Sequence, residues 1–144
     1  MSPVSSSTAG SARVWSASER AIEELARYAG PVQALSRACI TGTDIGGHII
    51  AKGQVVVALI AAADRDPAQF PAPDELRLTR SPNAHVGFGR GPHSCMGQHI
   101  ARLEARALLS VIREETRSIE LAGDPVVRRN ATLRGLRHLP LRVN

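Results

Sequence analysis

One cysteine in a glycine-rich loop, Cys95, has the setting best suited to chemistry in this 144-residue chain. It lies in the stretch Phe-Gly-Arg-Gly-Pro-His-Ser-Cys-Met-Gly, directly before a long amphipathic pattern. A thiolate at the start of a helix is stabilised by the positive end of the helix dipole and by free backbone N–H groups. Three glycines, Gly89, Gly91 and Gly97, lack a Cβ, so the backbone can adopt positive φ and approach a flat ligand. The pattern favours a metal-ligating cysteine over a core thiol.

Residue types alone leave two other interpretations of this loop open. Cys95 with His93 and His99 is a candidate zinc site, and a Gly-Pro loop around a small buried cysteine is common. The spacing His-x-Cys-x3-His supplies only three ligands, however, and matches no usual zinc pattern. The spacing therefore disfavours zinc.

The loop resembles the haem-binding loop of the cytochrome P450 monooxygenases. It matches Phe-x-x-Gly-x-His-x-Cys-x-Gly at every fixed position, namely Phe88, Gly91, His93, Cys95 and Gly97. The resemblance implies that Cys95 is the axial thiolate ligand of haem iron, that Phe88 packs beneath the ring, and that His93 binds a haem propionate. It implies an oxidoreductase that inserts one oxygen atom of O2 into a small organic substrate, since a thiolate ligand favours O–O cleavage.

A second motif of that family lies upstream, in a helix predicted to begin with the capping box at residues 16–19. Glu24 and Arg27 are three residues apart, so they share a helix face and by themselves fit a surface ion pair. Ahead of a haem-thiolate loop they resemble the family's Glu-x-x-Arg pair, which implies a buried structural role. Arg77 or Arg80 would have to supply the third member of that group.

The segments after this helix predict a small sheet. Residues 32–40 alternate as a strand, and the arginine within it, Arg37, resembles the family arginine that pairs with a haem propionate. Residues 43–50 read as a hairpin turning at Gly46-Gly47, and residues 54–60 form a β-branched run typical of a buried strand.

The rest of the chain completes the expected fold. A proline-rich meander covers residues 70–76, apolar residues recur at helical spacing from Cys95 to about Glu115, and residues 119–143 predict a closing β-hairpin. The expected fold class is α+β, mainly α, and resembles the C-terminal part of the cytochrome P450 fold. Residues 1–15 are rich in Ser, Ala and Gly, which predicts disorder, and residues 16–144 then form a truncated haem-thiolate domain.

Composition narrows the compartment and the partners. The apolar runs are too short to span a bilayer, no signal peptide is visible, and two unrelated cysteines make no disulfide framework, so we expect a cytoplasmic protein with no membrane partner. The net charge of +5 comes from scattered arginines without a nucleic-acid-binding module. Arg90, Arg102 and Arg106 could gather near the cysteine loop, where the resemblance implies an acidic, ferredoxin-type redox partner.

The resemblance does not extend to the distal side of the haem. No long helix carrying the family's acid–alcohol pair precedes Glu24, so we expect no catalytic residue of that kind in these 144 residues. The resemblance therefore implies the enzyme class but not the activity of this chain by itself. The alternative hypothesis is a non-catalytic remnant or interaction module with weak or no haem binding.

Overall fold

The computed structural model describes the backbone of residues 8–144 and the side chains from residue 19 onward, and it begins with a long helix. Helix α1 spans Thr8–Ala29. Residues 1–7 of the predicted disordered segment lie outside the described residues, whereas residues 8–15 form the first turns of α1. The predicted helix start at Ser16 is therefore wrong. Alanine and arginine before Ser16 are strong helix formers, and a serine-based capping pattern does not exclude a helix that continues through it.

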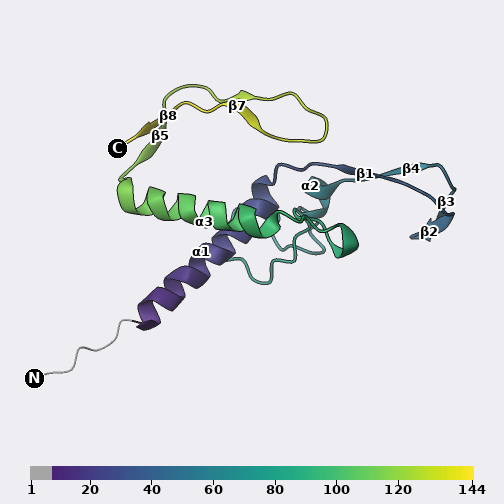
Figure 1. Ribbon diagram of the computed structural model, residues 1–144, viewed down its shortest axis with the longest axis horizontal. Coiled ribbons are helices and arrows are strands. Elements are labelled where there is room, and N and C mark those ends of the chain that lie inside the picture. Colours follow the sequence, from purple (N-terminus) through teal and green to yellow (C-terminus); the bar gives the residue numbers. More distant parts are fainter. Residues whose placement is uncertain (1–7) are drawn as a thin grey trace, which may run out of the picture.

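A β-arm follows α1 and extends away from the two long helices (Figure 1). Strand β1 (Leu35–Ala38) pairs antiparallel with β4 (Val55–Ala58), and β2 (Thr43–Ile45) pairs with β3 (His48–Ile50). Gly46 and Gly47 have φ of 60° and 83°, a left-handed conformation that favours glycine, and the predicted hairpin across them is confirmed.

The predicted burial of the β-branched run is wrong. Val55 and Val57 of β4 are 63% and 53% exposed. A strand is buried on both faces only where other layers cover it, and β4 belongs to a two-stranded sheet on the outlying arm. The β-branched composition of this segment therefore reflects its propensity to form a strand and not its burial.

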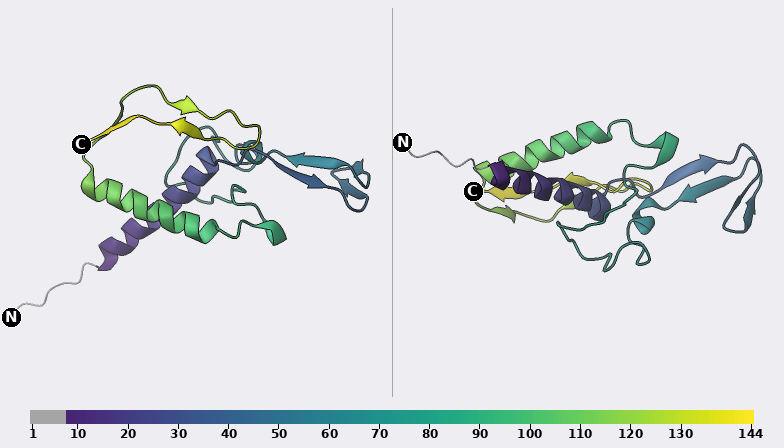
Figure 2. Two further views of the ribbon diagram at one scale, coloured as in Figure 1. Left: turned by 45° about the horizontal axis from the view of Figure 1, so that its top comes forward. Right: turned by 90° about the horizontal axis from the view of Figure 1, so that it is seen from below.

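The segment between the arm and the second long helix is mostly irregular. It contains the short helix α2 (Ile60–Ala63), the meander, and a 3-10 turn at Gly91–His93. Helix α3 (Gln98–Glu115) ends where the apolar periodicity predicted, and it packs across α1 (Figure 2). The crossing brings the start of α3, and with it the cysteine loop, alongside the C-terminal half of α1, where Arg102 pairs with Glu23.

The C-terminal residues form the predicted closing hairpin. Its base pairs β5 (Ile119–Leu121) with β8 (Leu141–Val143), and its outer part pairs β6 (Val126–Val127) with β7 (Leu136–His138). The far end returns to the chain ahead of β1, where the N–H of Gln33 donates to the carbonyl of Thr132 at 2.8 Å. This contact connects the hairpin to the arm.

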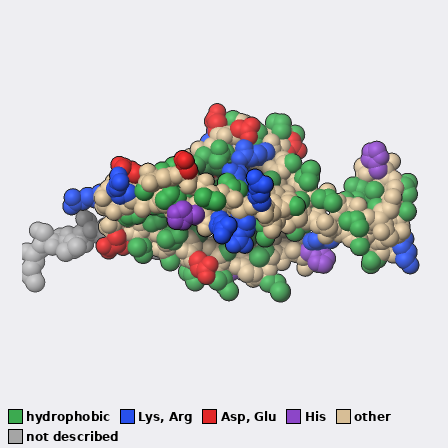
Figure 3. Space-filling model, turned by 90° about the horizontal axis from the view of Figure 1, so that it is seen from above, with side chains coloured by type: hydrophobic (Ala, Val, Ile, Leu, Met, Phe, Trp, Pro, Cys, Tyr) green, Lys and Arg blue, Asp and Glu red, His purple; other side chains and the backbone are tan. Residues whose placement is uncertain are grey.

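The interior is small and largely polar. Among side chains that the structure describes, Ile22 and Phe70 are the buried hydrophobic ones, beside the buried Glu24, Arg27, Asp64 and Arg80. Many large apolar residues are exposed instead, including four of α3: Ile100, Leu103, Leu108 and Val111. Figure 3 shows hydrophobic side chains over much of the visible surface. Within the described residues, no helix has the length and apolarity needed to cross a membrane.

Candidate functional site

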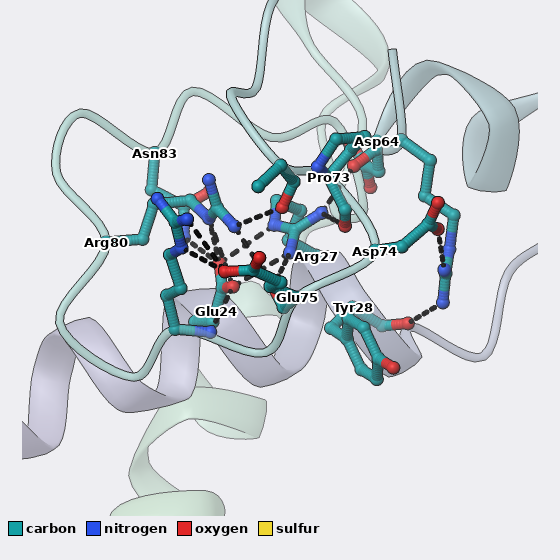
Figure 4. Close-up of polar contacts among 12 residues, drawn as sticks. Glu24, Arg27, Tyr28, Asp64, Pro73, Asp74, Glu75, Arg80 and Asn83 are labelled. Carbon is teal, nitrogen blue, oxygen red and sulfur yellow. Dashed lines mark hydrogen bonds and ion pairs between the residues drawn. The ribbon is translucent and has the colours of Figure 1, made fainter. Parts of the chain in front are cut away.

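The predicted Glu24–Arg27 pair lies at the centre of this polar interior (Figure 4). Both side chains are fully buried, and their ends meet in a two-pronged ion pair. Nε of Arg27 donates to Oε2 of Glu24 and Nη2 donates to Oε1, each at 2.8 Å. Because the residues are three apart on α1, the helix itself sets this geometry.

Arg27 also fixes the chain that wraps over α1. Its Nη1 donates to the carbonyl oxygens of Asp64 and Pro73 at 2.8 and 2.9 Å, and Nη2 donates to that of Glu75 at 3.2 Å. The guanidinium carbon lies 5.3 Å from the centre of the Phe70 ring, within cation–π range. One side chain of α1 therefore donates to three carbonyls of irregular chain, of which that of Glu75 also accepts from Arg80 at 3.0 Å.

Arg80 is the third member of the group, and Arg77 is not. Nε of Arg80 lies 3.0 Å from both carboxylate oxygens of Glu24, and the side chain is 5% exposed. Arg77 contributes its backbone N–H to Glu24 at 2.9 Å, while its guanidinium pairs with the exposed Glu75 carboxylate. Asn83, which sequence reasoning missed, donates its amide to Glu24 at 3.1 Å. We call Glu24, Arg27, Arg80 and Asn83 the Glu24 cluster.

Opposing effects act on the pKa values here. Burial by itself raises the pKa of Glu24, but donors from Arg27, the Arg77 backbone and Arg80 outweigh it and lower that pKa to about 2. The hydrogen bond to Glu24 raises the pKa of Arg27. For Asp64 burial dominates and raises the pKa, although the backbone N–H of Val86 donates to its carboxylate at 2.7 Å.

Acid should destabilise the protein through Glu24. Its ordinary pKa is 4.5, so the stabilisation is complete above that pH and is lost as the pH falls toward about 2. The difference corresponds to about 3 kcal/mol. Asp64 has the opposite sign, because a raised pKa favours folding as its carboxyl becomes protonated. Urea unfolding at neutral pH and at about pH 3 measures the net effect.

Two variants separate the two carboxyl groups. Glu24→Gln should flatten the loss of unfolding free energy in acid, and Asp64→Asn should steepen it. An unchanged acid dependence in Glu24→Gln would show that other carboxylates govern it.

The cysteine loop is fixed by backbone hydrogen bonds and two left-handed glycines. The N–H of Cys95 donates to the carbonyl of Phe88 at 2.8 Å, and the Cys95 side chain is exposed. Gly89 and Gly91 have φ of 72° and 68°, as the sequence predicted. Gly97 has φ of −81°, so the expected positive φ is wrong there. A Cβ on Gly97 would lie 3.9 Å from the Cys95 sulfur, an ordinary contact.

A cavity of about 330 Å³ lies beside this loop. Arg37 from β1 and His93 from the 3-10 turn both line it, together with Gly89 and the exposed Arg90. The rest of its lining is apolar: Leu35, Ala58, Leu59, Ile60, Ala63 and Val86. The fold therefore brings Arg37, Gly89 and His93 together, although they come from segments more than 50 residues apart. Cys95 and Phe88 are outside the lining.

The sequence also suggested a zinc site and a cluster of three arginines near the loop. Among the described residues no three His, Cys, Asp or Glu side chains lie close enough to hold a metal ion, so the zinc interpretation has no ligand set. The three arginines expected to gather near the loop have different partners. Arg102 pairs with Glu23 at 2.6 Å and Arg106 with Glu19 at 3.1 Å, whereas Arg90 lines the cavity.

Comparison with known proteins gives one consistent result. The family model described as Cytochrome P450 matches residues 18–115. Cytochrome p450 CYP199A2 of Rhodopseudomonas palustris is 38% identical over 128 residues, covering 89% of this chain and 31% of that protein. The 6-deoxyerythronolide B hydroxylase of Saccharopolyspora erythraea is 38% identical over 132 residues, covering 90% and 33%.

Solved structures agree with the sequence matches. The crystal structure of P450BioI in complex with a fatty-acyl-ligated acyl carrier protein superposes with a TM-score of 0.85 at 38% identity, covering 89% of this chain and 34% of that one. The described helices and antiparallel strands are thus those of a portion of that fold. This chain spans about a third of the length of the relatives it matches.

Proposed function

The chain belongs to the cytochrome P450 family, and from that premise we propose that it is the haem-binding portion of a haem-thiolate monooxygenase, with Cys95 as the axial ligand of the iron. One observation carries the proposal. Arg37 and His93, distant in sequence, line a single cavity immediately beside the loop that carries Cys95 just ahead of α3. That arrangement suits a flat, apolar ligand with anionic substituents.

The residues present fit haem by their chemistry. The apolar lining of the cavity, to which β1, β4 and α2 contribute, suits the porphyrin, and Arg37 and His93 are donors for its propionate carboxylates. The exposed thiol of Cys95 offers the soft ligand that iron accepts as thiolate. Gly89, whose φ of 72° favours glycine, borders the cavity without a Cβ, while Arg90 and His93 of the same loop contribute side chains to it.

The chain's own residues have distinct roles in this proposal. Arg37 and His93 orient the ligand through its carboxylates, and Cys95 supplies the sulfur. The Glu24 cluster holds α1, the meander and the segment before the loop in one arrangement, so that it acts on structure and not on chemistry. When bound, haem with a thiolate ligand supplies oxygen activation.

We also propose the family's substrate and partner classes for the complete protein. The substrate is a small organic molecule, in line with relatives whose names describe hydroxylases. The electron donor is an acidic, ferredoxin-type protein at the cysteine-loop face. Arg90 is an exposed cation there, whereas Arg102 and Arg106 already pair with Glu23 and Glu19.

One observation favours a second candidate, a non-catalytic interaction module with weak or no haem binding. The apolar residues of α3 and of the β-arm are exposed, which is typical of surfaces that dock on another polypeptide. The two candidates differ in whether the cavity and cysteine loop take up haem.

Haem titration of the purified chain tests the choice. We expect the reduced carbon monoxide adduct to show the strongly red-shifted absorption of thiolate-ligated iron. Haem dimethyl ester, whose carboxylates are blocked, should bind at least about tenfold more weakly, because each charge-assisted hydrogen bond contributes roughly 1.5–3 kcal/mol. Failure of the chain to take up haem would favour the interaction module, and uptake without the red-shifted band would contradict Cys95 as the ligand.

A further inference from the structure

A second ion-pair group, which the sequence did not reveal, lies half-buried between α1 and the cysteine loop. Glu23 accepts hydrogen bonds from Nε of Arg102 at 2.6 Å and from Nη2 of Arg102 at 3.0 Å. Its Oε2 also lies 2.9 Å from Nε2 of His85, whose side chain is 4% exposed. These three residues, here the Glu23 cluster, come from α1, the segment before the loop, and α3.

The hydrogen bonds of His85 define which nitrogen carries the proton. The backbone N–H of Gly87 donates to Nδ1 at 3.2 Å, so Nδ1 is the acceptor and Nε2–H donates to Glu23. The Arg102 guanidinium lowers the pKa of Glu23, and the hydrogen bond to Glu23 raises the pKa of Arg102. The cluster is therefore a carboxylate held by one guanidinium and one imidazole.

The cluster surrounds a particular aromatic ring. The guanidinium carbon of Arg102 lies 4.4 Å from the centre of the Phe88 ring, and the His85 ring lies 6.0 Å from it at a 54° tilt. Glu23 links Arg102 and His85 to α1, while Gln98 accepts a further hydrogen bond from Nη1 of Arg102 at 2.8 Å within α3. The position of the Phe88 ring relative to α1 therefore depends on Glu23. The backbone of Phe88 in turn accepts the hydrogen bond of Cys95.

We propose that Glu23 is a positioning residue, which holds Arg102 and His85 against Phe88 and thereby fixes the Phe88–Cys95 segment relative to α1. The consequence of this inference for ligand binding rests on the proposed haem-thiolate function. The contacts among Glu23, Arg102, His85 and Phe88 do not depend on haem. The Glu23 cluster packs against the Phe88 ring of the cysteine loop, whereas the Glu24 cluster, one residue later on α1, binds the meander.

The chain offers a matched control for this proposal. Glu19 and Arg106 form an ion pair between the same two helices, one turn away from Glu23 and Arg102. Loss of either pair removes one link between α1 and α3, but loss of Glu23 also separates Arg102 and His85, which lie against Phe88, from α1. Comparing Glu23→Gln with Glu19→Gln therefore separates positioning of the ring from general attachment of the helices.

The first measurement needs no haem. The chain contains two phenylalanines, Phe70 and Phe88, so a sample labelled with 4-fluorophenylalanine gives two ¹⁹F signals, which Phe88→Leu assigns. Glu23→Gln should shift or broaden the Phe88 signal and leave that of Phe70 unchanged, and Glu19→Gln should leave both unchanged. Equal changes in the two variants, or no change in Glu23→Gln, would overturn the proposal.

The second measurement uses the haem-loaded protein. Glu23→Gln should raise the rate of haem loss to a scavenger protein about tenfold or more and lower the red-shifted fraction of the carbon monoxide adduct, as loss of supporting contacts does at metal sites. Arg102→Lys keeps the charge but loses the two-pronged hydrogen bonding of the guanidinium, so its rate of haem loss should lie between those of wild type and Glu23→Gln. Wild-type haem release in Glu23→Gln would contradict the proposal.

Failure of the proposed function is distinguishable from failure of this inference. If the wild-type chain gives no red-shifted band but Glu23→Gln moves only the Phe88 signal, the haem-thiolate proposal fails and the positioning role stands. If the band is present and the Phe88 signal does not respond to Glu23→Gln, the positioning role fails alone.

Discussion

Replacing Glu24 by alanine is expected to destabilise the protein by about 3–5 kcal/mol, enough to leave much of the chain unfolded at room temperature. The substitution removes the acceptor for Arg27, Arg80, Asn83 and the Arg77 backbone, and it leaves two buried guanidinium groups without their counter-charge. Urea unfolding followed by circular dichroism measures the loss, and the haem-binding capacity of the same sample should fall with it.

A nearby exposed pair supplies the control for this substitution. Glu75→Ala removes an ion pair to Arg77 in which both side chains are about half exposed, so its effect should stay within about 1 kcal/mol. Glu24→Gln keeps the side-chain length but not the charge and should fall between the two. A Glu24→Ala protein as stable as Glu75→Ala would show that the Glu24 cluster contributes nothing to folding.

Replacing Cys95 by serine is expected to abolish the red-shifted carbon monoxide band of the haem-loaded chain. A serine hydroxyl stays protonated under conditions in which a thiol can ionise, and it is a much poorer ligand for iron. The fold should be preserved, because the Cys95 side chain is exposed and its structural hydrogen bond comes from the backbone N–H. Circular dichroism of the variant checks that expectation alongside the absorption spectrum.

Cys39 is the internal control for this experiment. It is the other free cysteine, adjoining β1, with its thiol within 2.9 Å of the carbonyl oxygen of Thr41. Cys39→Ser should keep the red-shifted band at full intensity. If Cys39→Ser removes the band and Cys95→Ser retains it, the ligand has been assigned to the wrong cysteine.

The sequence predicted the local elements well because their signals are local. The Gly46-Gly47 hairpin and the end of α3 near Glu115 follow from turn chemistry and apolar spacing. The start of α1 was predicted wrongly, because a helix can continue through a capping pattern that lies within a stretch of helix formers. The burial of β4 was also wrong, since burial depends on what packs against a strand and not on its composition.

The candidate site was predicted in part, for a similar reason. Motif spacing identified Glu24 and Arg27, but it could not choose between Arg77 and Arg80, whose roles depend on how the chain turns 53 to 56 residues after Glu24. Glu23, His85 and Arg102 carry no spacing signal, since a lone acid, histidine and arginine on separate segments usually belong to the solvated surface. Their grouping requires the crossing of α1 and α3.

The Glu24 carboxylate also determines how the molecule opens. Donors reach it from α1, from the meander and, through Asn83, from the segment before the cysteine loop. Detaching the meander takes Arg80 from the buried carboxylate, and detaching the segment before the loop takes the Asn83 amide from it. Each loss weakens the shared acceptor, so we expect these segments to open as one cooperative unit, a single foldon. The β-arm and the closing hairpin lie outside this group of contacts and can fray at lower free energy. The most cooperative part of the chain is thus held together by a buried ion-pair cluster and not by a large hydrophobic core.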